Sequence, residues 1–285
     1  MQKDLVFDVG MNNGDDTAYY LKRGFRVVAV EADPTLVDQA RERFAAEVRS
    51  GQLQLLNVAI GPRDEMADFW ICDEKREWNS FDLAFAARNG LPHHAIPVRC
   101  RPFGDLLAEH GVPLYLKIDI EGHDHYCLDA LDPGDLPRYI SLEMGPFELL
   151  FRLQALGYKD FKFITQNDHS QLYLDTTSLR AHVKRELRAR PALYKVGRRL
   201  SSLWPAPRVD TGANPDGILW DGSRRNGWHF RPGSSGPFGE DTPGRWQTIE
   251  EAAYTWTAYS LGQSKYGPPT IDIWHDVHAR RGDDA

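Results

Sequence analysis

The chain has 285 residues, of which 41% are hydrophobic and 26% charged, and its formal net charge is −7 at pH 7. This composition is typical of a globular protein and excludes collagen-like, disulfide-rich and mainly disordered chains. The sequence has no run of about 18 apolar residues, so we do not expect a membrane span.

The cysteines and the N-terminus bear on the compartment. The three cysteines, Cys72, Cys100 and Cys127, stand far apart and are odd in number, which favours free buried thiols in a reducing compartment. The first residues lead from Met1 through polar side chains into a strand-like run, without the apolar core of a signal peptide. We therefore expect a cytoplasmic location.

Short runs of β-forming residues alternate with helical stretches along the first part of the chain. This alternation is typical of βαβ units and predicts an α/β fold with a doubly wound, largely parallel sheet. The expected strands are 5–9, 26–31, 53–59, 114–119, 139–144, 160–164 and 270–276. The expected helices are 17–23, 34–48, 103–110, 126–131 and 147–156. Asp33 is expected to be the N-cap of the second helix, with Pro34 as its first residue.

The alternation stops at about residue 165, and a passage rich in Gly, Pro and Trp follows. We expect a cofactor-binding core at 1–165, an inserted lid or substrate region at 166–250 and a return to the core at 251–285. Six of the eight tryptophans lie beyond residue 200, so this polar region must bury aromatic rings. We expect the insertion to close over the acceptor.

Segment 180–208 is strongly basic, with nine Lys and Arg residues against one acid, Glu186. Such a segment can face an anionic substrate, nucleic acid or an acidic membrane surface. A solvated helix face explains it equally well.

The segment Phe7-Asp8-Val9-Gly10-Met11-Asn12-Asn13-Gly14 stands where a strand turns into a helix. Gly10 and Gly14 let the backbone approach a ligand, and the following helix N-terminus offers unpaired N–H groups. A dinucleotide fingerprint would place glycine at positions 12 and 15, which are Asn12 and Asp15 here. Asp8 and Asp15 would repel a pyrophosphate but suit the ammonium group of S-adenosylmethionine.

Two further strand ends add ligand contacts. Glu31 ends the second strand, where its carboxylate can accept hydrogen bonds from both hydroxyls of a ribose. Val58 and Ala59 follow the third strand and are expected near the adenine, although they also suit a plain core.

The fourth strand ends in Asp119, Glu121 and His123. In open α/β sheets, ligands bind outside the carboxyl ends of the strands. Two acids and a histidine at that edge suit general-base catalysis on a hydroxyl, or a metal site together with Glu143. We assign no metal. The group His275, Asp276 and His278 is explained by alternation along the last strand.

Taken together, the motifs resemble the FkbM family of methyltransferases. They are Phe7-Asp8-Val9-Gly10-Met11-Asn12-Asn13-Gly14, Val28-Ala29-Val30-Glu31-Ala32-Asp33-Pro34, Asn57-Val58-Ala59-Ile60-Gly61, Leu116-Lys117-Ile118-Asp119-Ile120-Glu121-Gly122-His123-Asp124 and Ile140-Ser141-Leu142-Glu143. The resemblance covers about residues 4 to 165 and the last strand. It implies a seven-stranded class I methyltransferase sheet, Rossmann-like, with an antiparallel last strand and a large insertion before it. It also implies S-adenosylmethionine as the cofactor and O-methylation of a hydroxyl on a sugar, glycan or natural product.

The resemblance also suggests which residues form the site. With the positions discussed above, the expected cofactor-binding residues are Asp8, Gly10, Asn12, Asn13, Gly14, Thr17, Glu31, Ala32, Asp33, Val58, Ala59, Ser80, Asp119 and Glu121. The chain departs from the family at Met11 and Asn13, and at Asp124, near which the family commonly has Glu. The proton acceptor therefore stays open among Asp119, His123 and Glu143.

Two other function classes remain. A nicotinamide-dependent oxidoreductase would share the sheet but lacks glycine at Asn12 and Asp15. A non-enzymatic protein could bind nucleic acid or anionic membranes through segment 180–208, with strongly salt-dependent affinity. We expect a small-molecule or glycan acceptor and no nucleic-acid partner, and the sequence leaves the oligomeric state open.

Overall fold

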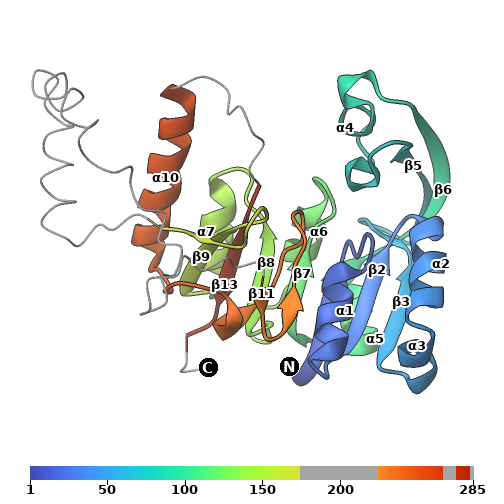
Figure 1. The fold of residues 1–285 in the computed structure, drawn as a ribbon, viewed down its shortest axis with the longest axis horizontal. Helices are drawn as coiled ribbons and strands as arrows, with labels where there is room; N and C mark the ends of the chain where they lie inside the picture. Colours follow the sequence, from blue (N-terminus) through green and yellow to red (C-terminus); the bar gives the residue numbers. More distant parts are fainter. Residues whose placement is uncertain (174–223, 266–273, 283–285) are drawn as a thin grey trace, which may run out of the picture.

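The computed structural model describes residues 1–173, 224–265 and 274–282. Its main sheet contains eight strands in the order β10-β9-β13-β8-β7-β1-β2-β3 (Figure 1). The strands of this sheet are β1 (Gln2–Val9), β2 (Arg26–Glu31), β3 (Leu53–Asn57), β7 (Pro113–Ile118), β8 (Tyr139–Glu143), β9 (Asp160–Thr165), β10 (Gln171–Leu172) and β13 (His275–Arg280). Strands β1, β2, β3, β7 and β8 pair in parallel, whereas β13 is antiparallel to β8 and β9.

This topology confirms the predicted α/β fold. The seven expected strands form one sheet, the order turns back between β1 and β7, and the last strand is antiparallel. The eighth strand, β10, adds two residues at the edge beside β9. The basic segment 180–208 lies outside the described residues.

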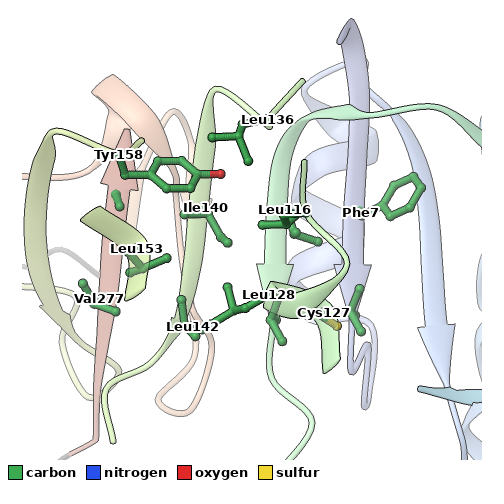
Figure 2. Packing of buried hydrophobic residues seen from close by; sticks show 14 of the residues in the cluster. Phe7, Leu116, Cys127, Leu128, Leu136, Ile140, Leu142, Leu153, Tyr158 and Val277 are labelled. Atoms are coloured by element: carbon green, nitrogen blue, oxygen red, sulfur yellow. The ribbon is translucent and has the colours of Figure 1, made fainter. Parts of the chain in front are cut away.

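Helices cover both faces of the sheet. They are α1 (Asp15–Lys22), α2 (Pro34–Arg43), α3 (Ala45–Ser50), α5 (Phe103–His110), α6 (Asp124–Asp129), α7 (Glu148–Leu156) and α10 (Ile249–Lys265). In β1, Leu5, Phe7 and Val9 join the core under α5, α6, α7 and α10, whereas Val6 joins the core under α1 and α2. Figure 2 shows the first of these cores, in which side chains of α6 and α7 pack on β7, β8 and β13.

The second core is completed by segment 224–248 instead of another helix. This segment contains β11 (Arg224–Arg225), β12 (Trp228–His229) and the 3-10 turn η4 (Gly239–Asp241). The Phe238 ring stacks on the Tyr115 ring with their centroids 4.1 Å apart, and Phe230 packs against Tyr19. Aromatic residues of the region predicted as an insertion therefore cover part of the sheet, which explains how a Gly- and Pro-rich passage buries its rings.

Three predicted boundaries were wrong. The predicted helix 34–48 breaks at Phe44, whose φ of −110° and ψ of 30° separate α2 from α3. Asp33 nevertheless caps α2 as predicted, because its side chain accepts the Thr35 N–H. The last strand, predicted to end at residue 276, continues to Arg280, because the alternating Val277 and Ala279 also enter the core, and residues 270–273 of that prediction lie outside the described residues.

The third wrong boundary lies where a second, unpredicted sheet begins. The predicted strand 53–59 ends at Asn57, and Ala59–Ile60 forms β4 of a second sheet with β5 (Glu65–Cys72) and β6 (His93–Arg101). Between β5 and β6 lie the 3-10 turns η1 (Arg76–Trp78) and η2 (Arg88–Gly90) and the helix α4 (Leu83–Ala86). This excursion extends beyond the carboxyl ends of β2 and β3 (Figure 1).

Among the described residues, no helix has the length and apolar character needed to cross a membrane.

Candidate functional site

A buried ion pair joins the two central strands below the site. Asp8 of β1 and Lys117 of β7 are paired in register, and both side chains are buried. The Lys117 ammonium lies 3.0 Å from Asp8 Oδ1 and donates to the Gly10 carbonyl, also at 3.0 Å. Burial by itself would lower the pKa of Lys117, but the nearby carboxylates of Asp8, Asp119 and Asp16 outweigh burial and raise that pKa. The ammonium therefore stays charged and fixes the loop after β1.

Gly10 lets that loop cross very close to the end of β7. Its φ is +85°, and a Cβ on this residue would lie 1.8 Å from the Asp119 carbonyl oxygen. The Gly10 N–H donates to the Val30 carbonyl, and the Asp119 N–H donates to the Val9 carbonyl. Only glycine fits this crossing without moving one of the two strands apart.

The Glu31 carboxylate braces the same loop from β2. Its Oε2 accepts the Asn12 N–H at 2.8 Å, and its Oε1 accepts the Asp33 N–H at 2.9 Å. Burial raises the pKa of Glu31, although the two backbone donors oppose this shift. Glu31 also lines the cavity described next.

A cavity of about 440 Å³ lies at the carboxyl ends of β1, β2, β7 and β8. Gly10, Glu31, Asp119 and Glu143, which follow or end these four strands, all line it. Strand carboxyl ends at the point where strand order turns back are the usual ligand site of open α/β sheets.

Three carboxylates meet on the β7 and β8 side of this cavity. Oxygens of Asp119, Glu121 and Glu143 all lie within 4.8 Å of one another. The extended chain assumed in the prediction is wrong, because β7 ends at Ile118 and Glu121 has a φ of +49°. The left-handed turn at Glu121, and not strand alternation, brings its carboxylate back toward Asp119. The spacing would also allow a hard divalent cation to be held by these oxygens.

Burial and mutual repulsion shift the protonation of these acids. Burial, followed by the neighbouring carboxylates, raises the pKa of Glu121 to about 9 and that of Glu143 to about 7. Burial also raises the pKa of Asp119 well above its usual range. The group therefore shares protons at neutral pH, as closely spaced carboxylates do.

His123 lies beside the acids. Its ring stacks on Phe81 at a centroid distance of 4.7 Å, and burial lowers its pKa. Its Nδ1 is buried and has no hydrogen-bond partner among the residues that the structure describes. The imidazole is therefore neutral at pH 7 and able to accept a proton.

The loop after β12 forms another wall of the cavity and is fastened to α1. The Asp16 carboxylate accepts the Ser234 hydroxyl, the Ser235 N–H at 3.0 Å and the Gly236 N–H at 3.3 Å. Ser234 itself lines the cavity. Asp16 thus attaches the region predicted to be a lid to the helix that follows the glycine loop.

The variant Asp16→Asn tests this attachment. The asparagine amide would place a donor against one of the backbone N–H groups, so we expect a loss of about 1 to 3 kcal/mol in the free energy of unfolding. Hydrogen exchange at Ser235 and Gly236 should become faster. Asp38→Asn on the exposed face of α2 is the control, with an expected change within about 0.5 kcal/mol. Unchanged exchange at both amides in Asp16→Asn would contradict the attachment.

The cavity is lined by most of the residues predicted for the site. Those that line it are Gly10, Asn12, Asn13, Glu31, Ala32, Val58, Ala59, Asp119, Glu121, His123 and Glu143. Those that do not line it are Asp8, Gly14, Thr17, Asp33 and Ser80.

The predicted residues that do not line the cavity contact protein groups around it. Asp8 accepts hydrogen bonds from Lys117 and from the Thr17 hydroxyl, so its expected contact with a ligand ammonium is not available in this structure. Asp33 is bonded to Arg76, and the Ser80 hydroxyl donates to the Glu121 carbonyl at 3.2 Å. Their contacts are with protein groups that hold the cavity wall.

Several residues at the site were missed in the sequence. Lys117 interrupts a buried apolar strand opposite Asp8, and such a charged pair is a recognisable signal once β1 and β7 are placed side by side. Arg88 and Trp78 come from the missed excursion, and Ser234 comes from a loop more than 200 residues after the glycine loop. No local pattern marks these three positions.

Comparison with known proteins gives one family match. The model of the Methyltransferase FkbM domain matches residues 8–173, which is more than half of the chain. A curated relative, the probable ribosomal RNA small subunit methyltransferase A of Methanospirillum hungatei JF-1, is 42% identical over 52 residues. These residues make up 18% of this chain and 20% of that protein, so the chain spans about a fifth of the length of this relative.

The solved structures to which the chain is similar include two methyltransferases. Methyltransferase FkbM from Methylobacillus flagellatus KT is 16% identical with a TM-score of 0.34, and the match covers 50% of this chain and 32% of that one. A SAM-dependent methyltransferase from Thiobacillus denitrificans in complex with S-adenosyl-L-homocysteine is 9% identical with a TM-score of 0.34. That match covers 98% of this chain and 85% of the other.

Proposed function

Since the chain belongs to the FkbM methyltransferase domain family, we propose that it transfers the methyl group of S-adenosylmethionine to a hydroxyl of a sugar, glycan or natural product. The family match confirms the resemblance seen in the sequence and the cofactor class that it implied. The hydroxyl acceptor is the part that we propose.

One observation carries the proposal: a single cavity holds both the glycine loop and a set of proton acceptors. Gly10 and Glu31 line it, and so do Asp119, His123 and Glu143. A bound cofactor and an acceptor hydroxyl would therefore meet within one cavity. Bringing two reactants together in this way is a large part of catalysis by methyltransferases.

The residues of the glycine loop fit the cofactor. Gly10 leaves the loop without a Cβ where it lines the cavity, and Asn12 and Asn13 line it as well. Each Glu31 oxygen accepts one backbone N–H, which leaves further acceptor capacity for ribose hydroxyls. Bound there, S-adenosylmethionine would supply a methyl group activated by a positively charged sulfur. Val58 and Ala59 would pack beside its adenine.

The acids and the histidine would take the proton of the hydroxyl. As the hydroxyl oxygen forms its bond to the methyl carbon, the carbon–sulfur bond breaks and the O–H proton passes to a base. Glu143, with a pKa of about 7, is half carboxylate at neutral pH and is the best poised of the three. Burial raises the pKa of Asp119 well above its usual range, which favours its protonated form, and the neutral His123 is the alternative acceptor.

The pH profile tests the role of Glu143. Only its carboxylate accepts a proton, and with a pKa of about 7 the carboxylate fraction rises from about a tenth at pH 6 to about nine tenths at pH 8. Turnover should rise over this range. Glu143→Gln should lower turnover by about 10²-fold or more and remove this rise, with the affinity for S-adenosylmethionine unchanged. The exposed Glu148→Gln on α7 is the control.

The other two candidates are tested in the same assay. Asp119→Asn and His123→Ala are measured for turnover and cofactor affinity beside Glu143→Gln. Full turnover in all three variants would rule out general-base catalysis by this group.

The remaining parts of the proposal concern the whole chain. We propose residues 1–165 as the cofactor-binding core, 166–250 as the region that closes over the acceptor and 251–285 as the return to the core. We also propose a cytoplasmic location, supported by the free, buried Cys72, Cys100 and Cys127. No specific observation favours the oxidoreductase or the non-enzymatic alternative.

A further inference from the structure

Arg88 places a positive charge in the wall of the cavity. It begins the turn η2 of the excursion between β5 and β6, and its side chain lines the cavity together with Glu121 and Glu143. Its guanidinium carbon lies 3.8 Å from the centre of the Trp78 ring and 3.9 Å from the centre of the Phe85 ring. Two aromatic rings therefore hold the planar head in place.

The Arg88 guanidinium lacks a polar partner in the described part of the chain. No carboxylate oxygen of the described residues lies within 4.0 Å of its nitrogens, and no described group accepts a hydrogen bond from it. Its Nε is buried without an acceptor. A partly buried guanidinium with unused donors is costly, because arginine groups in such places are normally paired.

The other arginines of the cavity differ from Arg88. Arg76 forms an ion pair with the buried Asp33, and Arg231 is 76% exposed and lies 3.8 Å from Asp15. Among the described residues, Arg88 is thus the cavity-lining arginine whose guanidinium is packed against aromatic rings and forms no ion pair.

The nearby acids do not substitute for a ligand. Arg88 is close enough to Glu121 and Glu143 to oppose the rise in their pKa values, yet neither acid forms an ion pair with it. Glu121, with a pKa of about 9, is protonated at neutral pH, which reduces the negative charge that an incoming anion would meet. The guanidinium instead lies against the rings of Trp78 and Phe85.

We propose that Arg88 binds an anionic group of the acceptor, so that the acceptor is a hydroxyl compound carrying a carboxylate or a phosphate. This inference rests on the proposed methyl transfer and names the class of its substrate. The planar guanidinium donates two parallel hydrogen bonds to such an oxyanion, while the acceptor hydroxyl lies toward Glu143.

Anion titration of the intact chain tests the proposal. Sodium phosphate and sodium acetate are titrated by calorimetry into protein saturated with S-adenosylhomocysteine, against sodium chloride at equal ionic strength. Wild type should bind at least one of the two oxyanions. Arg88→Gln should bind it about tenfold more weakly, and Arg88→Lys, which keeps the charge but loses the bidentate geometry, by an intermediate factor. The exposed Arg49→Gln on α3 should bind like wild type.

The outcomes separate the possibilities. Binding of phosphate alone indicates a phosphorylated acceptor, and binding of acetate indicates a carboxylate. Equal affinity in wild type and Arg88→Gln, or no binding of either anion by wild type, would overturn the proposal. Binding of S-adenosylhomocysteine is measured first, and its absence would count against the proposed function. The anion titration is repeated without it, so that the result for Arg88 stands on its own.

Discussion

Gly10→Ala is expected to be much more damaging than the same change at Gly24. Both residues have a φ of +85°, so both substitutions carry the same backbone cost, about 1 kcal/mol. No atom lies within 4 Å of a Cβ at Gly24, whereas a Cβ at Gly10 would overlap the Asp119 carbonyl. Moving β1 and β7 apart at this crossing should cost about 2 to 3 kcal/mol more.

Urea unfolding and calorimetry with S-adenosylmethionine measure both consequences. Gly24→Ala should keep wild-type affinity for the cofactor, because Gly24 lies between α1 and β2 and away from the cavity. Gly10→Ala should lose measurable affinity even under conditions where it remains folded. Equal losses of stability in the two variants, with cofactor binding retained in both, would contradict the close crossing of the glycine loop and β7.

Lys117→Met is expected to be the most destabilising single substitution on the central strands. It leaves Asp8 buried without its cation and removes the donor to the Gly10 carbonyl. Breaking a buried ion pair by removing one partner typically costs about 3 to 5 kcal/mol. Lys3→Met, on an exposed position of the same sheet, should change the free energy of unfolding by less than about 0.5 kcal/mol.

A double variant separates the charge from the packing. Lys117→Met combined with Asp8→Asn removes both charges, so it should be more stable than Lys117→Met alone. If Lys117→Met unfolds at the same urea concentration as Lys3→Met, the ion pair does not hold the two strands together. If the double variant is no more stable than the single one, the loss comes from packing and not from the unpaired Asp8.

The sheet could be predicted because its signal is local and repeated. Each strand from β1 to β9 of the main sheet is a short run of β-forming residues, and the helices between them carry caps such as Asp33 and Gly157. The resemblance to the FkbM family added the antiparallel last strand, which is confirmed.

The excursion between β5 and β6 was missed because its sequence is less regular. The strand β6 contains Pro97 and several exposed polar residues, and η1, α4 and η2 each span only three or four residues. Such short elements depend on tertiary contacts, for example the packing of Phe81 on His123. Their propensity alone does not distinguish them from loops.

The residues at the centre of the cavity could be predicted better than those at its edges. Gly10, Glu31 and Asp119 line the cavity as expected because each sits at a strand end, where topology dictates position. The contact of Asp8 with Lys117 was not predicted, because it depends on the register between two strands that are far apart in sequence. Arg88 depends on an element that was not predicted at all.

Calorimetric titration of the wild-type chain with S-adenosylmethionine and, separately, with NAD distinguishes the two cofactor classes. We expect one site for S-adenosylmethionine and no binding of NAD. Glu31→Gln should reduce the affinity for S-adenosylmethionine about tenfold or more, because Glu31 would lose the charge that strengthens its bonds to the ribose hydroxyls. Binding of NAD in place of S-adenosylmethionine, or affinity for S-adenosylmethionine that is unchanged in both Gly10→Ala and Glu31→Gln, would contradict these expectations.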